Sequence, residues 1–149
     1  MKDLYNHIVP TKVVAPIVGT NGSPPAAVAD IDLAGFNSAV LVWEVGLEAG
    51  VLAAGLYWTL KLEHADDDGT GAAGAYSEVA AADVLGVTPA AGILWTVDAP
   101  AEDETVYYCG YVGGKRFLKV TIAETGATAG MPQSVLLIKG HGQDVPAIT

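Results

Sequence analysis

The chain has 149 residues, which is the size of one globular domain and long enough to bury a substantial core. Hydrophobic residues make up 51% and charged residues 16%, which argues against intrinsic disorder, and a single cysteine excludes a disulfide framework. With 17 acidic and 7 basic residues the net charge is -10, so the chain lacks the positive field that attracts nucleic acid or an anionic membrane surface. We therefore expect neither nucleic acid nor a membrane among its partners.

The mean hydropathy of +0.37 does not by itself indicate a membrane protein. The longest uncharged apolar run, residues 49–60, is shorter than the roughly 20 residues that a helix needs to cross a bilayer. Charged residues and Pro10 interrupt the first part of the chain, where a secretory signal would be continuously apolar, so no such signal is expected. The 18 glycines and 8 prolines favour short strands and turns over long helices.

The first 29 residues are rich in proline and contain a turn signal at residues 21–23. Proline has no N–H for a sheet ladder, and it biases the preceding residue toward an extended conformation. Residues 1–29 are therefore predicted to form an extended N-terminal arm, which could contain a short strand at residues 12–18. The prolines of this arm are Pro10, Pro16, Pro24 and Pro25.

The next segment predicts two strands. Residues 39–45 follow a turn at residues 35–38 and are rich in β-branched and aromatic side chains, which is typical of a strand buried on most of its surface. Residues 46–50 are predicted to be a hairpin connection and residues 57–64 the return strand. The return strand alternates, because one face belongs to the core and the other is exposed to solvent. Its predicted core face consists of Trp58, Leu60 and Leu62.

The middle of the chain predicts a loop and one ambiguous element. Residues 65–75 contain three consecutive aspartates and several glycines, so they are predicted to form a surface loop. Residues 77–85 fit a short helix that is capped by Ser77 and ends at Gly86. They also fit a strand that ends in a turn at residues 80–83.

The remaining strands complete the predicted fold. They are expected at residues 93–97, 105–112, 117–123 and 134–139. Gly113 and Gly114 predict a two-residue hairpin, and residues 140–149 are a short polar tail. Short strands with turns at intervals of about 8 to 12 residues are typical of a β-sandwich or barrel. We therefore expect an all-β, antiparallel β-sandwich, jelly-roll or immunoglobulin-like, over residues 30–149, preceded by the arm.

The acidic run at residues 66–68 partly matches the start of a calcium-binding loop. However, Gly69 comes too early, and Ser77 stands where the bidentate glutamate belongs. A solvated hairpin tip is the preferred interpretation, with a weak cation site as the alternative. The three histidines have no metal-ligand spacing, so we expect no metal and no cofactor.

The sequence contains no pattern that indicates catalysis. None of the serines lies in a Gly-x-Ser-x-Gly turn, and Cys109 lies inside a predicted strand, where a small buried hydrophobe is more common than a reactive thiol. The glycines at positions 110, 113 and 114 precede a strand and do not open a helix, as a phosphate-binding loop would require. We therefore expect that the chain is not an enzyme.

Lys115 and Arg116 are adjacent, directly after the Gly-Gly turn, in a chain with only 7 basic residues. Their charges could pair with acidic groups on a partner surface or with the chain's own aspartates and glutamates. Both interpretations are open from the sequence.

Three segments carry a resemblance to a known family. They are residues 31–39 (IDLAGFNSA), residues 60–67 (LKLEHADD) leading to residues 76–79 (YSEV), and residues 110–120 (GYVGGKRFLKV). These segments resemble those of small proteins encoded among the head genes of tailed bacteriophages and prophages. The resemblance implies a capsid decoration, or cement, protein: a β-sandwich that clamps neighbouring major capsid subunits from outside.

The resemblance also implies partners and a location. The partners would be the major capsid protein and sibling copies, as a dimer or trimer, and the location the outer surface of the capsid of a virion made in the host bacterial cytoplasm. The arm could add a strand to a neighbour's sheet edge. The candidate partner-binding residues are Pro10, Pro16, Pro24, Pro25, Lys115 and Arg116.

Two alternatives stay open. A carbohydrate-binding β-sandwich module would use exposed aromatic side chains, for which Trp43, Trp58 and Trp95 are candidates. Another virion component, such as a head-spike or tail protein, would show the same fold and acidity.

Overall fold

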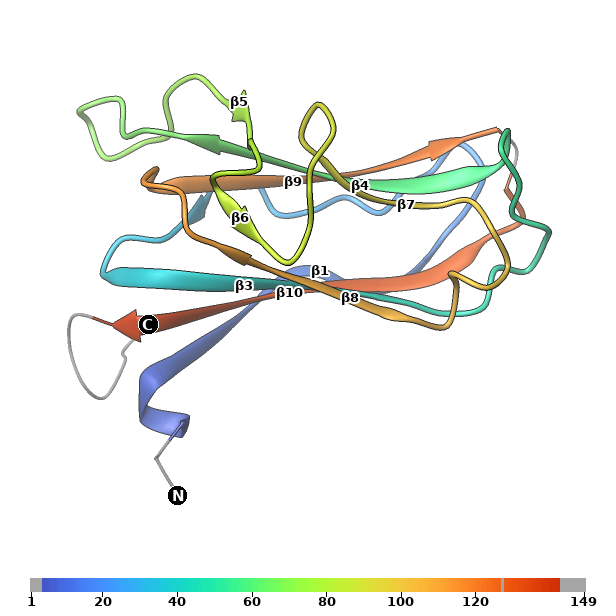
Figure 1. Ribbon diagram of the computed structural model, residues 1–149, viewed down its shortest axis with the longest axis horizontal. Helices are drawn as coiled ribbons and strands as arrows, with labels where there is room; N and C mark the ends of the chain where they lie inside the picture. Colours follow the sequence, from blue (N-terminus) through green and yellow to red (C-terminus); the bar gives the residue numbers. More distant parts are fainter. Residues whose placement is uncertain (1–3, 127, 143–149) are drawn as a thin grey trace.

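The protein is a sandwich of two antiparallel sheets in a computed structural model that describes residues 4–126 and 128–142 (Figure 1). Sheet I contains, in spatial order, β1 (Ile8–Gly19), β10 (Met131–Gly142), β3 (Phe36–Val45), β8 (Val106–Tyr111) and β6 (Val84–Leu85). Sheet II contains, in spatial order, β2 (Ile31–Asp32), β9 (Phe117–Thr125), β4 (Tyr57–Ala65) and β5 (Ser77–Glu78), and β7 (Ile93–Val97) also pairs with β4. One 3-10 turn, η1 (Tyr5–His7), precedes β1. The predicted all-β antiparallel sandwich is confirmed.

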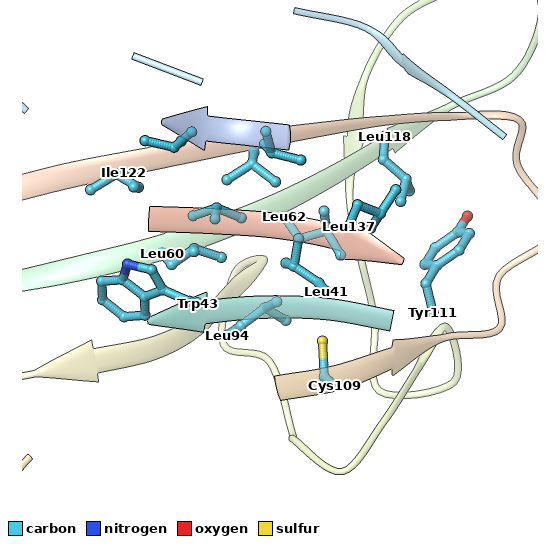
Figure 2. Close-up of a cluster of buried hydrophobic side chains, with 14 of the residues drawn as sticks. Leu41, Trp43, Leu60, Leu62, Leu94, Cys109, Tyr111, Leu118, Ile122 and Leu137 are labelled. Atoms are coloured by element: carbon cyan, nitrogen blue, oxygen red, sulfur yellow. The ribbon is translucent and has the colours of Figure 1, made fainter. Parts of the chain in front are cut away.

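The core fills the space between the two sheets (Figure 2). Successive side chains of a strand point to opposite faces, so every second residue of β3 and of β4 enters this space. Leu41 and Trp43 of β3 and Leu60 and Leu62 of β4 are all 0% exposed. The predicted core face of residues 57–64 is thus confirmed.

The extended N-terminal arm predicted for residues 1–29 is not found in the described part of that segment. Residues 8–19 form β1, which includes the short strand predicted at residues 12–18 and pairs with β10 from Ile8 to Gly19, and Val13 and Val14 are buried in the core. The physical reason is that β1 is an edge strand: only one side of its backbone needs ladder donors, so Pro10 and Pro16 are tolerated inside it. The register shifts twice between Lys12 and Ile17, which bends the strand around its prolines.

Two predicted hairpins are also wrong. Strand β3 pairs with β10 and β8, whereas β4 pairs with β9, β7 and β5, so residues 46–50 begin a crossover between the sheets. Likewise Gly113 and Gly114 connect β8 in sheet I to β9 in sheet II, so they do not form the predicted hairpin. Glycines allow the chain to reverse direction, but they do not decide whether the next strand pairs with the last one or packs across from it.

The other predicted connections agree better with the structure. Residues 66–76 connect β4 to β5, which pair with each other, so the acidic loop is a hairpin connection. Residues 77–85 contain the short strands β5 and β6, with a turn closed by the 2.9 Å bond from Asp83 N to Ala80 O; the helix is therefore wrong and the strand with a turn is right.

The chain ends of the described part bear on two further predictions. Strand β10 continues to Gly142, so the polar tail does not begin at residue 140, and residues 143–149 lie outside the described residues. Within the described ranges, no helix has the length and apolarity to cross a bilayer.

Candidate interaction surface

The outer face of sheet I is mostly apolar. Residues directly opposite each other in antiparallel strands share a face, so the pairing of Leu136 with Val42, and of Val42 with Tyr108, makes one outward row. A second row joins Ile138 to Val40 in the same way. Tyr108 is 70% exposed, although it lies in a strand, β8, rather than in a loop. The other exposed apolar residues that the register places on this face are Leu85, Val106 and Val18.

This apolar face is hollowed at both ends of β1. A groove of about 400 Å³ is lined at one end by Pro16, Ile17 and Val18 together with the ends of β3 and β10. A groove of about 600 Å³ lies at the other end, where Leu4 and residues of β1, β3 and β10 surround it. The face therefore combines exposed apolar rows with two grooves, and we call the outward side chains of β1, β10, β3, β8 and β6 the sheet I face.

Only two charged side chains of the described strands project from the sheet I face. Lys12 of β1 stands opposite Leu136, and Glu44 of β3 stands opposite Ser134, so the two charges lie on either side of β10. Glu44 accepts a 3.3 Å hydrogen bond from Ser134 Oγ, and neither charge forms an ion pair within the described residues. The face thus carries one charge of each sign and no local net charge.

The outer face of sheet II has the opposite character. Lys61 Nζ lies 2.9 Å from Glu78 and 3.4 Å from Glu63, and Lys119 Nζ lies 3.2 Å from Glu63. Partial burial would raise the pKa of Glu63, but hydrogen bonds and charge from the two lysines hold it below its usual value. Of the large hydrophobic side chains that are exposed in the described residues, none belongs to β2, β4, β5, β7 or β9.

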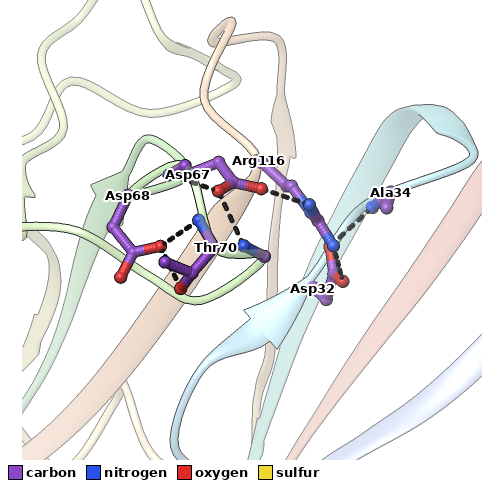
Figure 3. A network of polar contacts seen from close by, with 8 residues as sticks. Asp32, Ala34, Asp67, Asp68, Thr70 and Arg116 are labelled. Carbon is purple, nitrogen blue, oxygen red and sulfur yellow. Dashed lines mark hydrogen bonds and ion pairs between the residues drawn. The ribbon is translucent and has the colours of Figure 1, made fainter.

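The pair Lys115 and Arg116, predicted as a candidate partner site, is bound by the chain's own side chains. Figure 3 shows the contacts of Arg116. Arg116 makes a two-pronged contact with Asp32, 2.8 Å from Nε and 2.7 Å from Nη2, and its Nη1 binds Asp67. Lys115 Nζ donates to Ser77 Oγ at 2.9 Å and lies 3.8 Å from Asp66. The intramolecular interpretation of this pair is the one that the structure supports.

The acidic loop is held by its own backbone. Asp67 Oδ1 accepts hydrogen bonds from the N–H groups of Gly71 and Gly69, and these bonds lower the pKa of Asp67. Asp68 Oδ1 accepts from both the N–H and the hydroxyl of Thr70. In residues 4–126 and 128–142, no group of three or more His, Cys, Asp or Glu could hold a metal ion.

A buried polar cluster lies at this end of the sandwich. His64 Nδ1 is 3.0 Å from Tyr111 Oη, and His64 Nε2 is 4.0 Å from Asp83. Burial lowers the pKa of His64, and it raises the pKa of Tyr111 to about 12. Burial also raises the pKa of Cys109 to about 12, so its thiol remains protonated and packs as a small apolar group, as expected.

The tryptophans belong to the core and its margin. Trp43 and Trp58 are fully buried, and their ring N–H groups donate to Gln133 Oε1 at 3.1 Å and to Glu48 Oε2 at 3.0 Å. Trp95 is partly buried and packs against the rings of Trp43 and Tyr107, which also contact each other. Two of the three tryptophans considered for carbohydrate binding therefore cannot reach a sugar.

The predicted proline sites are scattered. Pro10, Pro16 and Pro24 are exposed, but Pro25 is buried, and of the four only Pro16 lines the 400 Å³ groove. The sheet I face was missed by reasoning from sequence. Its signal was the unbroken apolar character of residues 39–43 and 135–138, which predicted burial and placed apolar side chains on both faces of two strands.

No protein-family model matches the chain, and no curated protein matches it. Among solved structures, it is similar to a subunit of Bacillus endospore appendages, described as disulfide-linked pili, at 16% identity and a TM-score of 0.36, covering 90% of this chain and 88% of that chain. It is also similar to the VP2 subviral particle of infectious bursal disease virus, at 15% identity and a TM-score of 0.36, covering 93% of this chain and 34% of that chain. The chain spans about a third of that viral chain. TM-scores of this size carry no conclusion about what the protein binds.

Proposed function

We propose that this chain is a structural virion protein, specifically a capsid decoration protein that binds the outer surface of the major capsid shell of a tailed bacteriophage and stabilises it. The observation that carries the proposal is the sheet I face. Soluble monomers seldom expose continuous apolar patches larger than a few hundred Å², and larger ones mark sites of association. A protein built this way works as part of an assembly.

The rest of the molecule fits a binding role. Four of the six basic side chains in the described residues form ion pairs within the chain, among them Arg116 with Asp32 and Lys61 with Glu78, so a partner surface would not rely on them. A decoration protein stabilises a shell through contact area repeated over many copies, so modest affinity at each copy is sufficient. The resemblance of residues 31–39, 60–67, 76–79 and 110–120 to phage head proteins supports the choice of a capsid as the partner.

The proposal is tested with heads assembled from the major capsid protein encoded in the same genome as this chain. Purified protein is mixed with DNA-free expanded heads, and the heads are recovered by sedimentation. We expect saturable binding and a higher temperature of head disruption. No binding to these heads would overturn the proposal, and binding to purified tails instead of heads would assign the chain to the tail.

A further inference from the structure

The charges on the sheet I face indicate what kind of molecule could bind it. The chain carries a net charge of -10, so a second copy would be repelled by most of its surface. The sheet I face is the exception, because Lys12 and Glu44 are its only charged side chains within the described strands and they cancel. At this face, two copies can meet without opposing like charges.

We propose that the sheet I face binds the same face of a second copy, so that the functional unit is a two-fold symmetric dimer. This rests on the proposed function in taking the sheet I face to be an interface of the assembly and names its occupant: the face joins two copies, and the dimer contacts the capsid with its remaining surface. In a two-fold interface the same patch is used by both partners, so each charge must find its opposite on the other copy. The arrangement of the two charges meets this condition.

The geometry is as follows. Lys12 and Glu44 lie on β1 and β3, which are separated by β10, so their backbones are roughly 10 Å apart across the sheet. A two-fold axis that lies in the plane of the interface, crosses β10 between Leu136 and Ser134 and runs perpendicular to the line from Lys12 to Glu44 places Lys12 of each copy opposite Glu44 of the other. Leu136 and Val42 lie beside this axis and pack against the second copy.

The unpaired state of these two charges also supports the pairing between copies. Of the basic side chains in the described residues, Lys61, Lys115, Arg116 and Lys119 form ion pairs and Lys139 lies 4.7 Å from the Phe36 ring centroid. Lys12 has neither contact within those residues and stands at the margin of an apolar surface. Face-to-face packing of two sheets is also a common way to bury apolar sheet faces.

The test uses charge reversal and sedimentation velocity on the full chain. Wild type is expected to sediment as a dimer, and Lys12→Glu or Glu44→Lys alone to raise its dissociation constant about 10-fold, since each creates two like-charge contacts per dimer. The double variant Lys12→Glu/Glu44→Lys is expected to return to within about 3-fold of wild type. Rescue by the double variant cannot arise from loss of fold.

A monomeric wild type, or a double variant no better than the singles, would overturn the dimer. Binding to phage heads is measured on the same four proteins, which separates this proposal from the function. A monomer that still binds heads leaves the decoration role standing and removes only the dimer. A dimer that does not bind heads would support this interface and overturn the decoration role.

Discussion

The two sheets of this sandwich share one core but present opposite outer faces. On sheet II, the outward residues of β4 and β9 form cross-strand ion pairs, with Glu63 between Lys61 and Lys119. On sheet I, the matching positions of β3 and β10 hold Val40, Val42, Leu136 and Ile138. Strand geometry is the same on both sides, so the difference lies in the side chains alone.

The difference indicates that the two outer faces have different roles. Sheet II satisfies its charged groups within the chain and needs no partner to do so. Sheet I leaves apolar area exposed to water, which costs free energy until another surface covers it. Inner positions should therefore control stability, sheet I outer positions should control association, and sheet II should carry the dependence on pH and salt.

The largest effect is expected from comparing two neighbours on β3. Leu41 is 0% exposed and Val40 is 36% exposed, so Leu41→Ala should lower the free energy of unfolding by about 2 to 5 kcal/mol and Val40→Ala by no more than about 0.5 kcal/mol in dilute solution. Urea denaturation measures both. The cost of Val40→Ala should grow with protein concentration as copies associate. Equal costs for the two variants in dilute solution would contradict the division between faces.

The next effect concerns pH and His64. Burial, the largest cause, and the charge of Lys115 lower its pKa below 6.5, against the opposing charges of Asp83 and Asp66. A lowered pKa in the folded state means that its neutral form is favoured, so this stability is complete above pH 6.5 and is lost as the pH falls through the folded-state pKa.

We therefore expect the urea midpoint of the wild type to fall between about pH 7.5 and about pH 5.5. The variant His64→Gln can still hydrogen-bond Tyr111 but does not titrate, so its midpoint should change less over the same range. A fall of the same size in His64→Gln would place the titration elsewhere.

The smallest effect is expected at Arg116. Replacing it with glutamine leaves Asp32 and Asp67 without their cation, but the group is solvent-accessible, so the loss of stability should be small and should shrink further at high salt. Arg116→Lys is the matched control, because it keeps the charge and loses the two-pronged contact with Asp32. If high salt enlarged the difference between wild type and Arg116→Gln, an electrostatic role for this pair would be wrong.

The sequence predicted the local features and not the long-range ones. Alternation in residues 57–64 correctly identified Leu60 and Leu62 as core, because a pleated strand has a fixed period of two. Glycine turns could not reveal that β3 and β4 belong to different sheets. The prolines of β1 led to the prediction of an arm in place of a full edge strand, because the sequence does not show which side of a strand lacks a neighbouring strand.

The candidate site shows the same limit. Arg116 hydrogen-bonds Asp32, which is 84 residues away in the sequence, and no sequence pattern predicts such a contact. The apolar runs at residues 39–43 and 135–138 were visible in the sequence, yet they predict burial without showing whether the chain's own second sheet or another molecule covers them. That question requires the positions of both sheets.

The central claim is that sheet I, and not sheet II, is the associating face. Its most direct test is the sedimentation velocity of two matched lysine variants, Val42→Lys on the outer face of β3 and Thr121→Lys on the outer face of β9, each compared with wild type. We predict that Val42→Lys is monomeric at concentrations where wild type is dimeric, and that Thr121→Lys sediments as wild type. Loss of the dimer in Thr121→Lys, or its persistence in Val42→Lys, would contradict the account.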